Sequence, residues 1–264
     1  MAGGKLSARQ KMINLMYLVF IAMMAMNMSK EVLSAFGLME AKFADANEST
    51  AERNDMLLAE LERKGEENPE AFKASAARAQ QVKIASDKFF TYLESLKRDI
   101  IETGEYELDE NGKLPFEAMD KTDILDEAWF TGDRLTKKGE EVMANLNQYK
   151  SAINDILAKD ESYRGRAEAF EKTFSTAQEE NKDGKKIDWL NYNFQGYPAI
   201  ASYTKLTALQ NDVRVTESDM FSLFLGNIVS EATTLNNYQA IVLADKSAFF
   251  AGEQFQGRVV IGKY

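Results

Sequence analysis

The feature that most constrains this chain is an uncharged stretch of 18 residues, MINLMYLVFIAMMAMNMS, which runs from Met12 to Ser29. At 1.5 Å of rise per helical residue, this stretch spans about 27 Å, close to the roughly 30 Å hydrocarbon thickness of a bilayer. A cleavable signal peptide needs a shorter apolar core and a small-residue cleavage site, and the sequence AMNMSKEV provides none. We therefore predict a retained transmembrane helix over residues 12–29.

The basic residues around this stretch predict its orientation. Lys5, Arg9 and Lys11 precede it, and Lys30 alone follows it closely. Because Lys and Arg resist translocation, we expect a cytoplasmic leader over residues 1–11 and an exterior portion outside the inner membrane. The exterior portion has a net charge of −13, since the leader holds three of the 32 basic residues and none of the 42 acidic ones. This charge argues against nucleic acid and anionic lipid as partners.

The chain contains no Cys and no His. Thiol catalysis, disulfides, zinc fingers and Ser-His-Asp triads are therefore excluded. Carboxylate pairs such as Glu66 with Glu67 have no adjacent glycine-rich phosphate loop, metal-spaced cluster or nucleophile elbow, so we interpret them as solvated helix faces. We expect no enzyme activity, no catalytic residue, no metal site and no cofactor.

The exterior portion is predicted to be a mainly α-helical bundle domain over residues 30–237. After the predicted span, apolar residues recur mostly at three- and four-residue spacing, at Val32, Phe36, Met39, Phe43, Ala46, Thr50, Leu57 and Leu61. One helix is therefore expected from about Ser7 to Lys64. An interruption at Gly37 is the alternative, because glycine weakens a helix, and it would place a hinge at the membrane exit.

The sequence GEENP predicts the end of this helix and the start of the next. It places Gly65 at a C-cap and Pro69 at the first position of a second helix, which should reach about Ile101. The apolar stripe of the second helix comprises Phe72, Ala76, Ala79, Val82, Ala85, Phe89, Leu93, Leu96 and Ile100. This face must pack against other helices.

The remaining sequence predicts one hairpin, further helices and terminal strands. Asn111-Gly112 predicts a small ribbon that joins residues 106–108 to residues 113–116. Further helices are expected from an N-cap at Asp133 to about Ile156, over residues 163–180, and over residues 198–231 with a break near the β-branched residues 213–216. Residues 238–264 alternate like strands and should begin a β domain. Either these strands add to a partner or the sequence is a fragment of a longer protein, and we expect the fragment.

Five polar residues in or beside the predicted span are candidates for functional contacts. Arg9 and Tyr17 are candidates for contacts with a surrounding protein, because a guanidinium or a phenol hydroxyl has no partner in lipid. Alternatively, both residues are interfacial. Asn14 and Asn27 are candidates for polar contacts between helices. Glu31 is either an interfacial carboxylate with access to protons or the partner of Lys30. The central run contains no Asp or Glu, so a proton carrier at mid-membrane would have to come from another chain.

The string KLSARQKMINLMYLVFIAMMAMNMSKEVLSAF, from Lys5 to Phe36, resembles the GldM/PorM family of the type IX secretion and gliding machinery of Bacteroidetes. The resemblance implies a pair of transmembrane helices inside a collar of five GldL copies, with proton flow driving the pair. It also implies a dimeric exterior stalk with immunoglobulin-like β domains that reach GldK and GldN. Arg9, Tyr17 and Glu31 match polar positions of the family, and Arg9 is implied to engage a collar glutamate. Ala8 departs from the proline that is common there.

The leading hypothesis is thus a membrane-anchored motor subunit that converts proton entry into movement of an exterior stalk. One alternative is a single-pass sensor, although 11 residues before the span cannot house an effector domain. Another alternative is a passive scaffold that tethers an exterior complex to the membrane.

Overall fold

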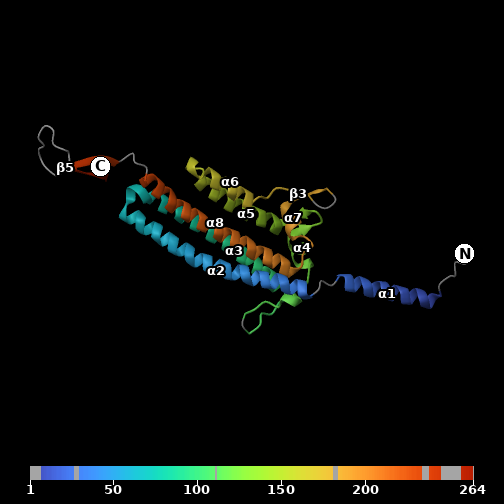
Figure 1. The fold of residues 1–264 in the computed structure, drawn as a ribbon. Helices are drawn as coiled ribbons and strands as arrows, with labels where there is room; N and C mark the ends of the chain where they lie inside the picture. The colour runs from blue at the N-terminus through green and yellow to red at the C-terminus, as the bar shows by residue number, and fades with distance from the viewer. Residues whose placement is uncertain are drawn as a thin grey trace.

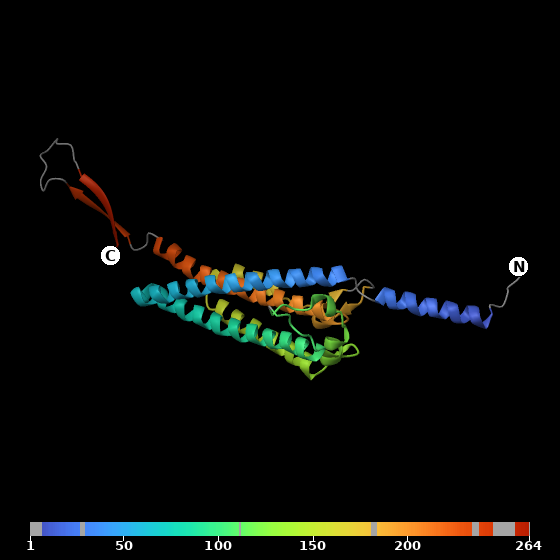
Figure 2. The ribbon, with the colours of Figure 1, turned by 90° about the horizontal axis from the view of Figure 1, so that it is seen from below.

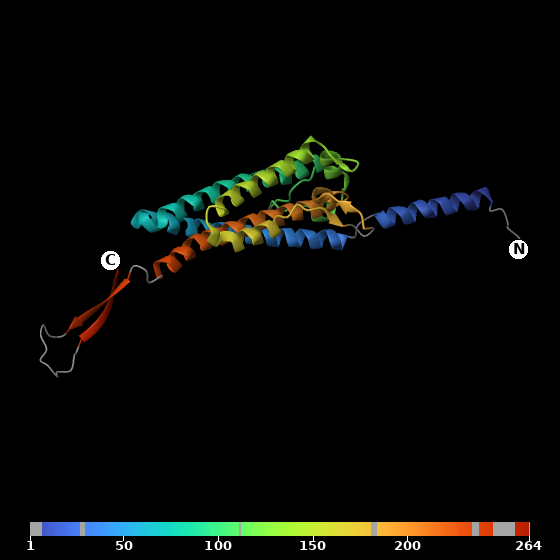
Figure 3. The ribbon, with the colours of Figure 1, turned by 90° about the horizontal axis from the view of Figure 1, so that it is seen from above.

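The computed structural model describes residues 7–26, 30–110, 112–180, 184–233, 238–244 and 257–263. This part of the chain is mainly helical and elongated (Figure 1). Its main helices are α1 (Ala8–Met26), α2 (Lys30–Glu67), α3 (Pro69–Gly104), α5 (Lys137–Leu157), α6 (Arg164–Thr173) and α8 (Ala199–Thr233). The helix α1 lies beyond one end of the bundle, which we call the α1 end, and the terminal strands lie beyond the other (Figures 1 and 3).

Three long helices form the centre of the bundle. The helices α2 and α3 form an antiparallel hairpin, and α8 lies beside both of them, parallel to α2 (Figure 2). The helix α5 packs on α3, and α6 packs on α5. A cluster of aromatic rings fills this layer, because Phe89 stacks on Tyr149 with 5.0 Å between ring centroids and Phe170 and Phe174 meet Tyr149 edge-on.

The predicted second helix is confirmed as α3. Pro69 occupies its first turn, and the apolar stripe is buried at Ala79, Val82, Phe89, Leu93, Leu96 and Ile100. The prediction that Gly65 is a C-cap is wrong, because α2 continues to Glu67. A Cβ on Gly65 would lie 3.2 Å from the Cβ of Ala76, so this glycine permits the close approach of α2 and α3.

The proposed hinge at Gly37 is absent, because α2 is continuous through this residue. Gly37 is buried, and a Cβ there would overlap the ring of Phe116. Phe116 belongs to the short helix η1 (Phe116–Ala118), which packs on α2. The glycine is therefore explained by packing and not by bending.

The segment between α3 and η1 contains the predicted turn but not the predicted ribbon. Gly112 has a φ of +75°, and the amides of Gly112 and Lys113 donate to Asp109. No strand is assigned to the described residues on either side. The reason is that Tyr106 folds back into the core, where it is 8% exposed, while Leu114 and Phe116 pack against the core from the other arm.

The middle of the chain differs from prediction in its helix boundaries. The helix α5 begins at Lys137 with Thr136 as N-cap, because Thr136 accepts a hydrogen bond from the amide of Gly139, and Asp133 lies in the turn before it. The helix α6 ends at Thr173. Short elements complete this region: α4 (Asp123–Trp129), β1 (Phe130–Thr131), β2 (Arg134–Leu135), η2 (Glu161–Tyr163), β3 (Glu179–Glu180), β4 (Lys186–Ile187) and α7 (Trp189–Phe194).

The helix α8 is unbroken, so the predicted interruption near residues 213–216 is wrong. Val213 is fully buried, and its packing overrides the lower helix propensity of β-branched residues. The predicted strands are confirmed as β5 (Tyr238–Ala244) and β6 (Gly257–Lys263), which pair antiparallel with Tyr238 opposite Lys263. Within the described ranges, no helix combines the length and the apolarity needed to cross a membrane.

Candidate functional site

The polar residues predicted to act in the membrane lie on or next to α1. Arg9, Asn14 and Tyr17 are exposed on this helix, and the side chain of Gln10 donates to the Asn14 side chain at 3.4 Å. Asn27 lies outside the described residues. Among the described residues, no hydrogen bond or ion pair of Arg9 or Tyr17 reaches the bundle. The structure therefore places Arg9, Asn14 and Tyr17 on one helix and does not bring them to a site formed with the bundle.

Glu31 lies in the first turn of α2, where a carboxylate is favoured by the helix dipole. Its neighbour Lys30 forms an ion pair with Glu117 at 3.4 Å between Nζ and Oε2. The hydroxyl of Ser34 also lies 3.5 Å from the Glu117 carboxylate. Glu117 thus attaches the η1 segment to the first turns of α2.

A second candidate, which was not predicted from the sequence, is a layer of buried and half-buried polar side chains between the three long helices. We call it the polar seam. It consists of Glu40, Asn47 and Asn54 on α2, Lys83, Asp87, Glu94 and Lys97 on α3, and Thr207, Gln210, Arg214 and Glu217 on α8.

The α2 side of the seam has a seven-residue period. Leu33, Glu40, Asn47, Asn54 and Leu61 follow one another at this spacing, and all five are buried. Residues seven apart lie on one face of a helix, as core positions do in a coiled coil. The two outer positions are leucine, and the three central ones are polar. Coiled coils use a polar residue at such a position to fix register at a cost in stability.

The two asparagines make the same contact one heptad apart. The Asn47 amide donates to the main-chain oxygen of Thr207 at 3.3 Å, and the Asn54 amide donates to that of Arg214 at 2.9 Å. Each pair is separated by 160 residues in the sequence. The repeat shows that α2 and α8 are parallel and in constant register over two turns.

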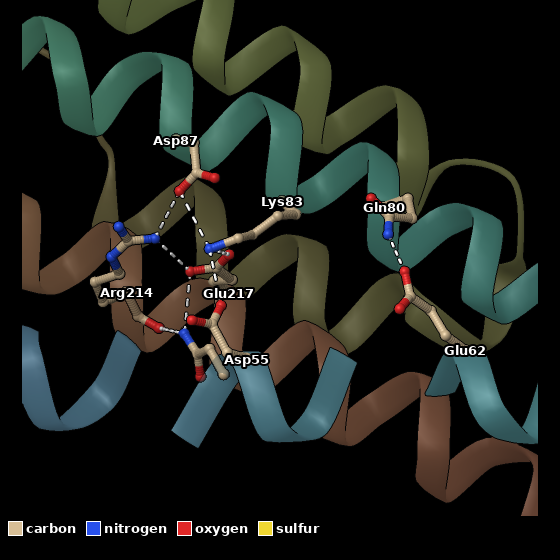
Figure 4. Close-up of polar contacts among 8 residues, drawn as sticks. Asp55, Glu62, Gln80, Lys83, Asp87, Arg214 and Glu217 are labelled. Atoms are coloured by element: carbon tan, nitrogen blue, oxygen red, sulfur yellow. Dashed lines mark hydrogen bonds and ion pairs between the residues drawn. The ribbon is translucent and has the colours of Figure 1, made fainter. Parts of the chain in front are cut away.

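An ionic cluster lies where Asn54 meets α8 (Figure 4). Arg214 lies 2.9 Å from both Asp87 and Glu217. Glu217 is fully buried, and it also accepts a hydrogen bond from Asn54 at 3.1 Å. Lys83 completes the cluster at 3.4 Å from Asp87 and 3.7 Å from Glu217. The cluster therefore joins side chains from all three long helices.

The neighbouring carboxylates favour the protonated, charged forms of Arg214 and Lys83. Burial by itself lowers the pKa of Arg214, but hydrogen bonds to Glu217 and Asp87 outweigh it, so the pKa is raised. Burial likewise lowers the pKa of Lys83, and the charge of Glu217 with the hydrogen bond to Asp55 raises it above its usual value. The Arg214 guanidinium also lies 4.3 Å from the centroid of the Phe90 ring. Both cations are thus stabilised in their charged forms.

Gln210 organises the part of the seam nearer the α1 end. It donates to Glu94 at 2.9 Å and accepts from Lys97 at 3.2 Å. Lys97 is 6% exposed, and its ammonium lies 4.8 Å from the centroid of the Tyr203 ring. Glu40 faces this group and accepts a hydrogen bond from the Thr207 hydroxyl at 3.2 Å. Burial raises the pKa of Glu40, although Lys97 and this hydrogen bond counteract the effect.

The side chains of the polar seam hold the three long helices together. Its charged groups are engaged with one another, and the described side chains include no group of three carboxylates able to hold a metal ion. A paired and hydrogen-bonded buried charge network specifies one arrangement of helices, because any slip leaves charges unpaired. We therefore assign the seam to the mechanical integrity of the bundle.

Two protein-family models match this chain. The GldM N-terminal domain matches residues 31–227, and the GldM second domain matches residues 229–264. The chain belongs to the GldM family. None of the curated proteins compared with the chain matches it. The matched ranges begin at residue 31, whereas the sequence resemblance rested on Lys5–Phe36, so two nearly separate parts of the chain lead to the same family.

GldM family membership makes the chain a component of the gliding and type IX secretion machinery, in a complex with other Gld proteins. GldM proteins are in general anchored in the inner membrane. The two GldM domains meet between residues 227 and 229, inside α8. A single continuous helix therefore passes from the first GldM domain into the second.

Proposed function

We propose that this GldM family member is an inner-membrane motor subunit that transmits movement from the membrane to a periplasmic stalk. In this proposal residues 12–29 cross the membrane once, with the leader in the cytoplasm and the bulk of the chain in the periplasm. Two copies stand inside a ring of GldL subunits, and proton flow through the ring moves the pair. The protein has no enzymatic activity and no cofactor of its own.

The observation that carries the proposal is the outward exposure of α1, the helix that precedes the GldM domains. Met12, Met16, Leu18 and Phe20 are each at least 60% exposed, although they lie on different sides of the helix. A helix that is apolar all round needs an apolar environment on every side. Membrane lipid or other transmembrane helices would supply that environment for residues 12–29.

The polar residues of α1 favour helices of another protein as the immediate neighbours. Arg9 and Tyr17 are eight residues apart, about 12 Å along the helix axis. In lipid the Tyr17 hydroxyl would lack a partner, and Arg9 is well suited to pair with a carboxylate at a protein interface. Since residues 12–29 contain no Asp or Glu, the carboxylate that carries protons must belong to the surrounding ring.

The bundle has the properties that a transmitting stalk requires. The helix α2 contains 38 residues, which corresponds to about 57 Å of continuous helix starting directly after the predicted span. The polar seam fixes α2 to α8, and α8 continues into the second domain. Movement that enters at Lys30 would therefore reach the second domain without a flexible joint in the described helices. Later domains would carry it toward outer-membrane partners of the GldK and GldN type.

One flank of α2 offers a surface for the second copy. Val32 and Met39 are 43% and 47% exposed, and Phe36 and Phe43, which alternate with them along the helix, are half-buried. Their alternating spacing of four and three residues is that of a helix-packing stripe. In a homodimer this apolar flank of each α2 would be covered by the other copy.

Replacement of Arg9 and Tyr17 in cells tests the proposal. Arg9→Ala and Tyr17→Phe should each reduce secretion and gliding, whereas Gln10→Ala, a control on the same helix, should leave both intact. Tyr17→Phe keeps the ring and removes only the hydroxyl, so it isolates the polar contact. Membrane insertion must be measured for every variant. If inserted Arg9→Ala and Tyr17→Phe proteins support normal secretion and gliding, the proposed roles are wrong.

A further inference from the structure

The α1 end of the bundle carries an apolar hollow with an acidic rim. The hollow has a volume of about 620 Å³ and lies between the first turns of α2 and the segment that links α3 to η1. In Figure 1 this segment extends from the bundle beside the first half of α2. We call this feature the proximal hollow.

Two large apolar side chains in the proximal hollow are uncovered. Leu38 is 67% exposed on α2, and Leu108 is 48% exposed on the opposite wall. Between them the hollow is closed by Phe116, which is held in place against Gly37. The ion pair of Lys30 with Glu117 fixes the same wall. The walls of the hollow are therefore held in place by contacts within the chain. Leu38 and Leu108 are accessible to an apolar side chain of another molecule.

The rim of the hollow is negatively charged. Residues 105–117 contain five exposed carboxylates, Glu105, Glu107, Asp109, Glu110 and Glu117, against the single ammonium of Lys113. Glu107, Asp109 and Glu117 line the hollow itself, and Glu105 and Glu110 lie beside them in the sequence. Glu117 is neutralised by Lys30, and Asp109 accepts hydrogen bonds within the turn. Among the described residues, no ion pair involves Glu105, Glu107 or Glu110. Their charge remains available to a partner.

We infer that the proximal hollow binds a cationic segment of a different subunit, with an apolar side chain between Leu38 and Leu108. The inference rests on the proposed function, which places this end of the bundle at the outer surface of the inner membrane. Anionic headgroups would be repelled by the rim. At this acidic rim, unlike at the apolar flank of α2, a second copy of this chain is also disfavoured, because its exterior portion has a net charge of −13. A Lys- or Arg-bearing loop of a membrane partner fits both the charge and the apolar contact.

Photo-cross-linking of the full chain in native membranes tests the inference. A photoreactive residue is placed at Leu38 or, as a matched control, at Met56, which is equally exposed on α2 at 66%. Because 18 residues are five helical turns, the two positions lie on one face of α2, about 27 Å apart. The cross-linked peptide is identified by mass spectrometry, with and without Glu107→Gln and Glu110→Gln. A third probe at Tyr17 reports on the membrane helix.

The expected product joins Leu38 to a segment of another membrane protein with more Lys and Arg than Asp and Glu. Its yield should fall about fivefold when Glu107 and Glu110 are neutralised, since the partner's cations then lose two carboxylates. Met56 should not give this product. A product with lipid, with a second copy or with a neutral or acidic segment overturns the inference, as does an absent product or a yield unaffected by charge.

The Tyr17 probe distinguishes a failure of the inference about the hollow from a failure of the proposed motor function. If Tyr17 cross-links to a transmembrane helix of another protein while Leu38 gives no cationic product, the hollow has no such role and the motor assignment stands. If Tyr17 contacts lipid alone, the motor assignment itself fails.

Discussion

Asn54 on α2 donates a hydrogen bond to the main-chain oxygen of Arg214 on α8, with 2.9 Å between nitrogen and oxygen. The Asn54 side chain is fully buried, and its amide nitrogen also lies 3.1 Å from a carboxylate oxygen of Glu217. One side chain thus satisfies a helix carbonyl and a buried charge together. Since a shift of either helix would break both bonds, this contact fixes the register of two parallel helices.

Removal of the Asn54 amide should destabilise the bundle strongly. Asn54→Ala leaves the buried Glu217 carboxylate with one donor fewer, and we expect the free energy of unfolding to fall by about 3 kcal/mol. Asn147→Ala on the exposed face of α5 is the control and should change it by less than about 0.5 kcal/mol. Urea unfolding of the chain in detergent, followed by circular dichroism, measures both. Equal effects of the two substitutions would show that Asn54 contributes no more to stability than an exposed asparagine does.

The Arg214–Glu217 pair should show strong coupling. Arg214→Leu or Glu217→Leu alone leaves an incompletely paired buried charge and should cost about 3–5 kcal/mol of unfolding free energy. The double variant removes both charges, so its cost should be smaller than the sum of the single costs by at least about 1 kcal/mol. A double-mutant cycle built from four unfolding curves measures this difference. Additive costs would contradict the described ion pair.

Glu40 should make stability depend on pH in a defined direction. Burial raises its pKa in the folded state above the value of 4.5 that applies to an ordinary glutamate, so the folded chain binds the proton more tightly than the unfolded chain does. Stability from this residue therefore increases as the pH falls from 7 through the raised pKa toward 4.5, and it is lost as the pH rises.

The variant Glu40→Gln isolates this effect. It keeps an oxygen for the Thr207 hydroxyl and removes the charge, so it should be more stable than the unchanged protein at pH 7, with the advantage shrinking at pH 5. Glu48→Gln, at an exposed position of α2, is the control for general charge effects. A stability difference that does not vary with pH would disprove the assignment to Glu40.

The close contact of Phe116 with Gly37 predicts that Gly37→Ala changes the unfolding free energy in opposite directions with and without the Phe116 ring. Gly37→Ala forces the new methyl group into the Phe116 ring and should lower the unfolding free energy by about 1–3 kcal/mol. In a Phe116→Ala background the clash disappears, and the same substitution should raise the unfolding free energy by up to about 1 kcal/mol, because alanine favours a helix more than glycine does. Thermal unfolding of the four proteins tests this. Destabilisation in both backgrounds would rule out the ring contact as the cause.

The long helices could be predicted from the sequence because their signals are local. Pro69 begins α3, and the stripe from Ala79 to Ile100 is buried as its spacing indicates. The break expected in α8 did not occur, since tertiary burial of Val213 outweighs a propensity cost of a fraction of a kcal/mol. The ribbon around Gly112 failed for the same reason, as Tyr106 gains more from the core than from a short ladder.

The polar seam could not be predicted from hydrophobic periodicity. The apolar spacing that predicted the helix includes Met39, which lies on the flank of α2, whereas Asn47 and Asn54 lie inside the bundle. The one local signal in the sequence is the recurrence of asparagine seven residues apart, at Asn47 and Asn54, in the same series as Leu33 and Leu61. Arg9 and Tyr17 are placed on α1 as expected, but the described part of this chain supplies no partner for either residue, so their roles remain predictions.

In the proposed motor, two copies of the first helix of this GldM family member stand inside a ring of helices from another protein. The copy number of each subunit in the purified membrane complex, measured by native mass spectrometry, tests it most directly. We expect two copies of this chain with about five copies of a partner that carries an intramembrane Glu or Asp. A single copy of this chain, or a pair that purifies without such a partner, would contradict it.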